Sequence, residues 1–220
     1  MKIIADRDIK YVKFTGWLLI VLAVMGLLLK GLQVKRQTFE LVLGQTGLLG
    51  VLLLISLGRL GELAEDFKKT RKTTPVFILA GLLLSWAIMW YREIIARRYG
   101  MAVAPGTGQV HVPNLDVINA DTVIITASII VLGPLLEEIL FRFIGLGLVR
   151  RLARPGQAAL FIGIWIIITS VMFALLHNPE PAALAVYLIS SVSYSVIYLR
   201  YGIFASILMH AAGNAGVYII

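Results

Sequence analysis

Long apolar segments alternate with short polar connections along the whole chain. Each apolar segment is 16 to 29 residues long, and a helix needs about 20 apolar residues to cross the hydrocarbon core of a bilayer. We therefore predict an all-α fold, a polytopic membrane helix bundle of about seven transmembrane helices. The predicted spans are Val12–Leu29, Phe39–Leu57, Pro75–Trp90, Asp121–Val149, Gln157–Leu176, Pro181–Leu199 and Ile203–Ile220.

The composition supports an integral membrane protein with lipid as its first partner. Of the 220 residues, 59% are hydrophobic and 15% are charged, whereas a soluble domain holds about 25% charged residues. The spans leave no room for a separate soluble domain. The chain has no cysteine, which excludes disulfides, a thiolate nucleophile and cysteine-ligated metal centres.

The basic residues predict an orientation. The net charge is +8, and of the 20 Lys and Arg residues 13 fall on one side of the predicted membrane and six on the other. Because cytoplasmic loops are enriched in Lys and Arg, the N-terminus is predicted to be cytoplasmic and the C-terminus outside, in the cell (plasma) membrane. Basic residues that flank apolar spans interact with lipid, so no nucleic-acid partner is expected.

Two connections are longer than simple turns. In the first, Leu60, Leu63 and Phe67 share one helical face, which fits either a short helix in the cytoplasmic interface or a solvated linker. The second, around residues 101–121, contains His111 and is predicted to cap a substrate entrance outside the membrane, with His111 itself incidental.

Three charged residues lie deep in the fourth span, where each costs roughly 2.5–3.5 kcal/mol on insertion scales. Glu138 and Arg142 are four residues apart and can pair along one helical face. Glu137 points about 100° away from Glu138 around the helix and lacks such a partner. One interpretation is a helix-packing salt bridge; the other gives Glu137 a chemical function.

Further polar residues are expected at a similar depth in later spans. His177 ends the fifth span, and His210 and Asn214 share one face of the seventh. Small residues near them would let a neighbouring helix approach closely: Ala211, Ala212, Gly213 and Gly216. A carboxylate, two imidazoles and an amide that converge in a dry place are typical of a hydrolytic site.

The motifs EEILFR, FALLH and HAAGN follow one another on successive spans and match the patterns EExxxR, FxxxH and HxxxN. The chain therefore resembles the CPBP family of intramembrane proteases, which includes CAAX prenyl proteases and bacteriocin-processing (Abi) proteins. The resemblance covers residues 121–220, so we predict a catalytic region there and an N-terminal three-span region at 1–120, within one integrated membrane domain.

The resemblance also implies roles for the motif residues. Glu137 and His177 would activate water, and His210 and Asn214 would form an oxyanion hole. The second glutamate and the arginine of the first motif, which form the pair described above, would support the site. No cofactor and no metal are expected, and the substrate would be a peptide or protein associated with the membrane.

Other functions remain open at this level. Glu137, His177 and His210 are a possible ligand set for a zinc-dependent membrane protease. Intramembrane acids and imidazoles also occur in proton-coupled transporters, and a non-catalytic binding or immunity protein would keep the same fold. The charge count places the site in the outer half of the membrane, which favours a leader peptide or C-terminal anchor over a cytoplasmic prenylated tail.

Overall fold

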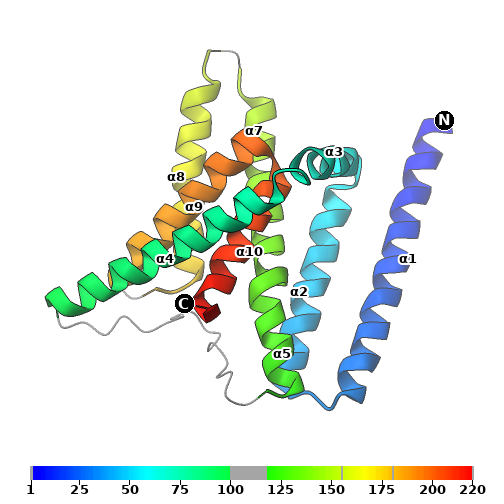
Figure 1. Cartoon of the computed structure of the whole chain (residues 1–220). Coiled ribbons are helices and arrows are strands. Elements are labelled where there is room, and N and C mark those ends of the chain that lie inside the picture. The colour runs from blue at the N-terminus through cyan, green and yellow to red at the C-terminus, as the bar shows by residue number, and fades with distance from the viewer. Residues whose placement is uncertain (1, 100–117, 155, 180, 220) are drawn as a thin grey trace. The chain divides into compact units, whose positions relative to one another are not determined.

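The computed structural model describes residues 2–99, 118–154, 156–179 and 181–219, and these residues form helices joined by short turns, without a strand (Figure 1). The long helices are α1 (Lys2–Gly31), α2 (Arg36–Ile55), α4 (Thr74–Tyr99), α8 (Ala158–Leu176), α9 (Pro181–Tyr201) and α10 (Ile203–Ile219). The shorter elements are η1 (Leu57–Arg59), α3 (Leu60–Thr70), α5 (Ala120–Ala127), η2 (Ser128–Leu132), α6 (Gly133–Glu137), η3 (Glu138–Leu146) and α7 (Gly147–Leu152).

The prediction of an all-α polytopic membrane protein is confirmed. Within the described residues, six helical stretches are long and apolar enough to cross a membrane, and α10 is a shorter apolar helix. A helix of 17 residues, the length of α10, rises only about 26 Å, less than the roughly 30 Å of a bilayer core. The seventh predicted span is therefore a short helix, which packs against α4, α9 and η3.

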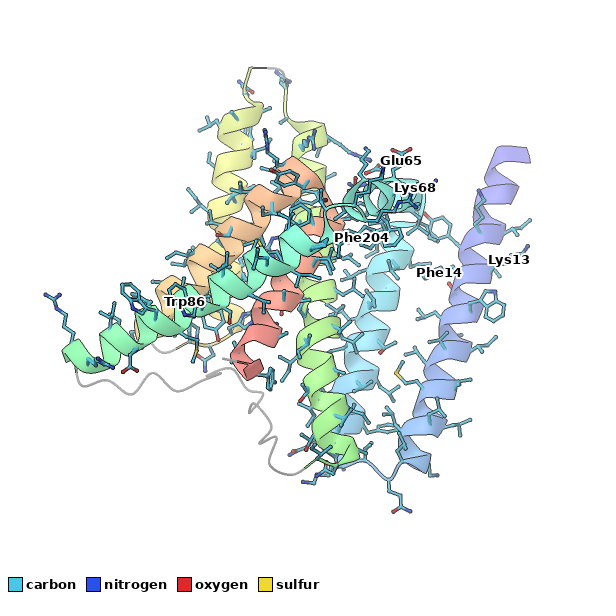
Figure 2. The ribbon with its side chains drawn as sticks, in the orientation of Figure 1. Lys13, Phe14, Glu65, Lys68, Trp86 and Phe204 are labelled. Carbon is cyan, nitrogen blue, oxygen red and sulfur yellow. The ribbon has the colours of Figure 1, made fainter. Side chains whose placement is uncertain are left out.

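The outer surfaces of the helices are apolar, as expected for contact with lipid. Leu83, Leu160 and Leu175 each expose more than half of their surface. Trp86 projects outward from α4 in Figure 2 and is 57% exposed. Soluble monomers rarely expose apolar patches of this extent. The protein is thus built to sit in a bilayer.

The chain divides into two compact units, and each unit combines two separate stretches of sequence. Unit 1 takes residues 1–62 and 113–136, and unit 2 takes residues 63–112 and 137–220. By contacts, α4 therefore belongs with the C-terminal helices. The predicted division at residue 120, between an N-terminal region and a catalytic region, remains a prediction about function.

Unit 1 contains α1, α2 and the start of the fourth span. Asn119 caps α5 by accepting a hydrogen bond from the Thr122 amide at 2.9 Å. The π-helical turn η2 precedes Pro134, whose ring would clash with the carbonyl group four residues earlier in a regular α-helix. The wider turn gives that carbonyl room, so the span continues past the proline without breaking.

Unit 2 is organised around a close approach of α4 and α10. An added Cβ at Gly81 would lie 2.7 Å from the Ala212 Cβ and 2.9 Å from the Gly213 amide nitrogen. One helical turn further on, a Cβ at Gly216 would lie 2.6 Å from the Ser85 Cβ. The predicted close approach at the small residues of the seventh span is confirmed, and α4 is the neighbour.

The connection between the second and third spans contains a helix, α3. Of the two interpretations of this connection, a short helix or a solvated linker, the structure shows the helix. Its Asp66 carboxylate accepts a hydrogen bond from the Ile203 amide at 3.2 Å and so caps the start of α10. Phe67 contacts Phe204 edge-on, with ring centroids 5.2 Å apart. Figure 2 labels Glu65 and Lys68 on this helix. The position of α3 in the membrane interface remains a prediction.

Gly81→Val is expected to destabilise the protein by about 1–3 kcal/mol, because overpacking moves the backbone of α10 rather than a flexible side chain. Thermal melting in detergent measures the effect. Gly163→Val is the matched control, since a Cβ at Gly163 in α8 meets nothing within 4 Å. Equal melting of the two variants would contradict the packing argument.

Candidate active site

The first motif lies where a regular helix becomes π-helical. Glu137 is the last residue of α6, and η3 begins at Glu138. Such wide turns are rare and frequently occur at functional sites. Gly145 leaves room on η3 for Trp165 of α8, whose indole nitrogen would lie 3.1 Å from an added Cβ.

Glu138 is the centre of a fully buried polar network and has no exposed surface. Its Oε1 accepts a hydrogen bond from Arg142 Nη1 at 3.0 Å and lies 2.9 Å from His210 Nδ1. Its Oε2 accepts a short hydrogen bond from the Ser206 hydroxyl. A buried carboxylate with these partners has its hydrogen-bonding capacity satisfied.

Arg142 is equally buried, and α9 provides most of its remaining partners. Arg142 Nη2 donates to the Ser191 carbonyl oxygen at 2.8 Å and contacts the Ser191 hydroxyl at 2.7 Å, while Nε lies 3.4 Å from Ser195 Oγ. The guanidinium carbon also lies 5.4 Å from the centre of the Phe173 ring. The predicted Glu138–Arg142 pair forms, and further hydrogen bonds from α9 and α10 complete the environment of both side chains.

His210 projects from α10 and is 3% exposed. Because the Glu138 carboxylate can only accept, the Nδ1 atom of His210 is the donor in their hydrogen bond. The other ring nitrogen, Nε2, lies 3.6 Å from Glu137 Oε2. Tyr194 of α9 stacks on the imidazole with centroids 4.3 Å apart and an interplanar angle of 17°.

His177 directly follows α8, and its Nδ1 lies 2.7 Å from the carbonyl oxygen of Phe173. A carbonyl only accepts, so this nitrogen also holds the proton, and Nε2 presents its lone pair to Glu137 Oε1 at 3.8 Å. His177 lies just outside the membrane-spanning segment Ala158–Leu176. Burial lowers the pKa of its imidazole from the ordinary 6.5, and the hydrogen bond to Phe173 partly opposes this effect.

Glu137 therefore lies between two imidazoles without a direct hydrogen bond to either one. Its side chain is 28% exposed, whereas its Oε2 atom is buried and has no hydrogen-bond partner. Separations of 3.6 and 3.8 Å are too long for direct hydrogen bonds. The Glu137 carboxylate and the two imidazoles therefore face one another without being hydrogen-bonded together.

The structure brings five of the six predicted residues into one cluster: Glu137, Glu138, Arg142, His177 and His210. Asn214 is half-buried and lies one helical turn beyond His210 on α10. His111 lies outside the described residues. Among the described residues, no group of three or more His, Cys, Asp or Glu side chains is placed to hold a metal ion.

Sequence reasoning missed the contribution of α9. This helix carries no motif, yet its Ser191, Tyr194 and Ser195 contact the ionic core of the site. A signal was present, because these polar residues and Tyr187 recur at spacings of three, four and seven on one face of a membrane helix.

The comparison with protein families completes the assignment. The model for type II CAAX prenyl endopeptidase Rce1-like proteins matches residues 119–216. This part of the chain belongs to the CPBP family of CAAX-type proteases. The match includes the whole cluster and excludes α1 to α4. No curated protein and no solved structure matches the chain.

This family match supports an intramembrane protease of the CAAX type in general, which acts on a peptide or protein substrate. The coarse prediction of a peptidase is thereby confirmed. Its apolar helices make it an integral membrane protein.

Proposed function

We propose that this CPBP protease hydrolyses a peptide bond by direct attack of a water molecule, without a metal ion. The observation that carries the proposal is the position of Glu137, whose buried oxygen has no partner and faces His210, while its other oxygen faces His177. Carboxylates and imidazoles are the usual general acids and bases of hydrolysis, and contribute about 10²–10⁴-fold.

In this mechanism a water molecule binds beside Glu137 and His177. One hydrogen points to the Glu137 carboxylate and the other to the lone pair on His177 Nε2. The water oxygen attacks the carbonyl carbon while its proton moves to Glu137, and the carbonyl oxygen becomes an oxyanion. When the tetrahedral intermediate collapses, the C–N bond breaks and Glu137 returns the proton to the leaving amine.

His210 and Asn214 stabilise the oxyanion in the proposed mechanism. His210 already uses Nδ1 for the bond to Glu138, so it donates from Nε2 only when both ring nitrogens are protonated. The ionised Glu138 beside it compensates for that positive charge. The support role of the Glu138–Arg142 pair is therefore electrostatic as well as structural.

The substrate that fits best is a membrane-associated peptide or a C-terminal anchor cleaved at the extracytoplasmic face. The first half of α8 contributes Ile162 and Trp165 to an apolar cluster with Leu63 of α3, and His177 follows the opposite end of α8. If α3 lies on the cytoplasmic side, as the basic residues predict, the water site lies in the outer half of the membrane.

A reporter fused after Ile220 is expected to behave as extracytoplasmic, and one inserted at Thr70 as cytoplasmic. Reporter activity in intact cells measures both positions. A cytoplasmic C-terminal reporter would place the site on the inner side and make a prenylated CAAX tail the better substrate.

Activity is expected to persist through pH 6.5 and to fall only at lower pH, because the water-binding role requires neutral His177 and burial lowers the pKa of that imidazole. A lowered pKa means that protonation occurs only below the ordinary value. The pH profile of cleavage in nanodiscs tests this expectation. A loss of activity that begins above pH 7 as the pH is lowered would contradict the assigned role of His177.

The proposed activity itself is tested with the purified protein in nanodiscs and two probes, a farnesylated CAAX peptide and an unprenylated peptide with an apolar C-terminal anchor. Mass spectrometry detects the cleavage products. We expect cleavage of the anchor peptide that survives treatment with a chelator. Loss of activity on chelation, restored by zinc, would favour the metalloprotease alternative.

A further inference from the structure

Helix α9 carries none of the three motifs, yet one of its faces contacts Arg142 and both imidazoles of the site. Ser191 and Ser195 bind Arg142, and Tyr194 stacks on His210. About two turns before Tyr194, Tyr187 contacts His177, with ring centroids 4.6 Å apart and an interplanar angle of 31°. Two tyrosines seven residues apart therefore contact the two imidazoles of the site.

The hydrogen bonds of the imidazoles do not by themselves fix the direction of Nε2. His210 is held at Nδ1 by Glu138, and this single bond leaves the ring able to tilt about the bonded atom. The nearly parallel Tyr194 ring restricts that tilt, because a face-to-face contact fixes the plane of the imidazole. Tyr194 is itself 3% exposed and has little room to move.

His177 is restricted in a comparable way. Its ring lies 4.5 Å from Phe173 and 4.6 Å from Tyr187, and the centroids of those two rings are 6.4 Å apart. The three rings thus form a triangle, in which Phe173 and Tyr187 cover the imidazole on two sides. Phe173 lies on α8, and its carbonyl oxygen is also the hydrogen-bond partner of His177. Tyr187, in contrast, connects the imidazole to α9.

We propose that Tyr187 and Tyr194 are positioning residues of the protease, which aim the Nε2 atoms of His177 and His210 at the water site beside Glu137. This inference rests on the proposed function. The rings act through their faces, so the proposal assigns no role to the phenolic hydroxyl groups. A misplacement of about 1 Å in a catalytic group can lower a rate by about 10²-fold.

The test compares ring-keeping and ring-removing substitutions. Tyr194→Leu and Tyr187→Leu are expected to lower kcat by about 10- to 100-fold with KM changed less than about threefold, whereas the Phe variants stay within about threefold of wild type. Tyr198→Leu is the matched control, because Tyr198 is a buried tyrosine of α9 that packs in the apolar cluster with Phe143, Leu146 and Ile203. It is expected to keep kcat.

A second measurement does not depend on cleavage. Nitrogen-15 NMR of histidine-labelled protein in nanodiscs reports the protonation and hydrogen bonding of each imidazole, and His177→Gln and His210→Gln assign the signals. The Leu variants are expected to shift the signal of the contacted histidine, and Tyr198→Leu to leave both unchanged.

The outcomes separate the two proposals. Unchanged kcat and unchanged signals in both Leu variants would overturn the positioning role, as would an equal loss of kcat in Tyr198→Leu. Shifted signals in a protein that cleaves neither peptide would support the positioning of the imidazoles and count against the proposed function.

Discussion

Glu137→Gln is expected to abolish cleavage, with a loss of at least about 10²–10⁴-fold, while the protein still folds and inserts into the membrane. The amide that replaces the carboxylate cannot take a proton from water. The amide keeps the shape of the side chain. The substitution also breaks no direct hydrogen bond to the imidazoles, because Glu137 lies 3.6 Å or more from both of them. Cleavage of the anchor peptide in nanodiscs and thermal melting in detergent measure the two effects.

The control for this substitution is Glu65→Gln, which makes the same chemical change on the exposed surface of α3. It is expected to retain full activity. Full activity in purified Glu137→Gln would exclude the glutamate mechanism, and loss of activity with a lowered melting temperature would indicate a structural role for Glu137 instead.

Arg142→Ala is expected to destabilise the protein by about 3–5 kcal/mol and to lower activity as well. The substitution leaves Glu138, which has no exposed surface, as a buried carboxylate without its guanidinium partner. It also removes the guanidinium hydrogen bonds to the carbonyl and hydroxyl oxygens of Ser191. Thermal melting in detergent at a fixed scan rate measures the loss.

Two comparisons sharpen this prediction. Arg97→Ala removes an exposed ion pair with Glu93, of the kind that contributes at most about 1 kcal/mol, and is expected to melt like wild type. Asn214→Ala is expected to lower activity alone, because it removes a proposed oxyanion donor and no buried charge. If Arg142→Ala also melts like wild type, the distinction between support and catalysis is wrong.

The sequence by itself determined the fold class and the residues to examine. Apolar segments of bilayer length leave few alternatives, since a backbone in hydrocarbon must satisfy its own hydrogen bonds and does so as helices. Charged and polar residues are expensive there, so Glu137, Glu138 and Arg142 stood out from their surroundings. The spacing of Glu138 and Arg142 also predicted their pairing correctly, because four residues form one helical turn.

Only the tertiary structure decided how these residues act on one another. The contacts of Glu137 with His177 and His210 join residues 40 and 73 positions apart, and local spacing carries no information about such distances. The same holds for the grouping of α4 with α10 and for the contribution of Ser191, Tyr194 and Ser206. Their neighbours are chosen by helix packing, in which side chains from several helices fill one shared space.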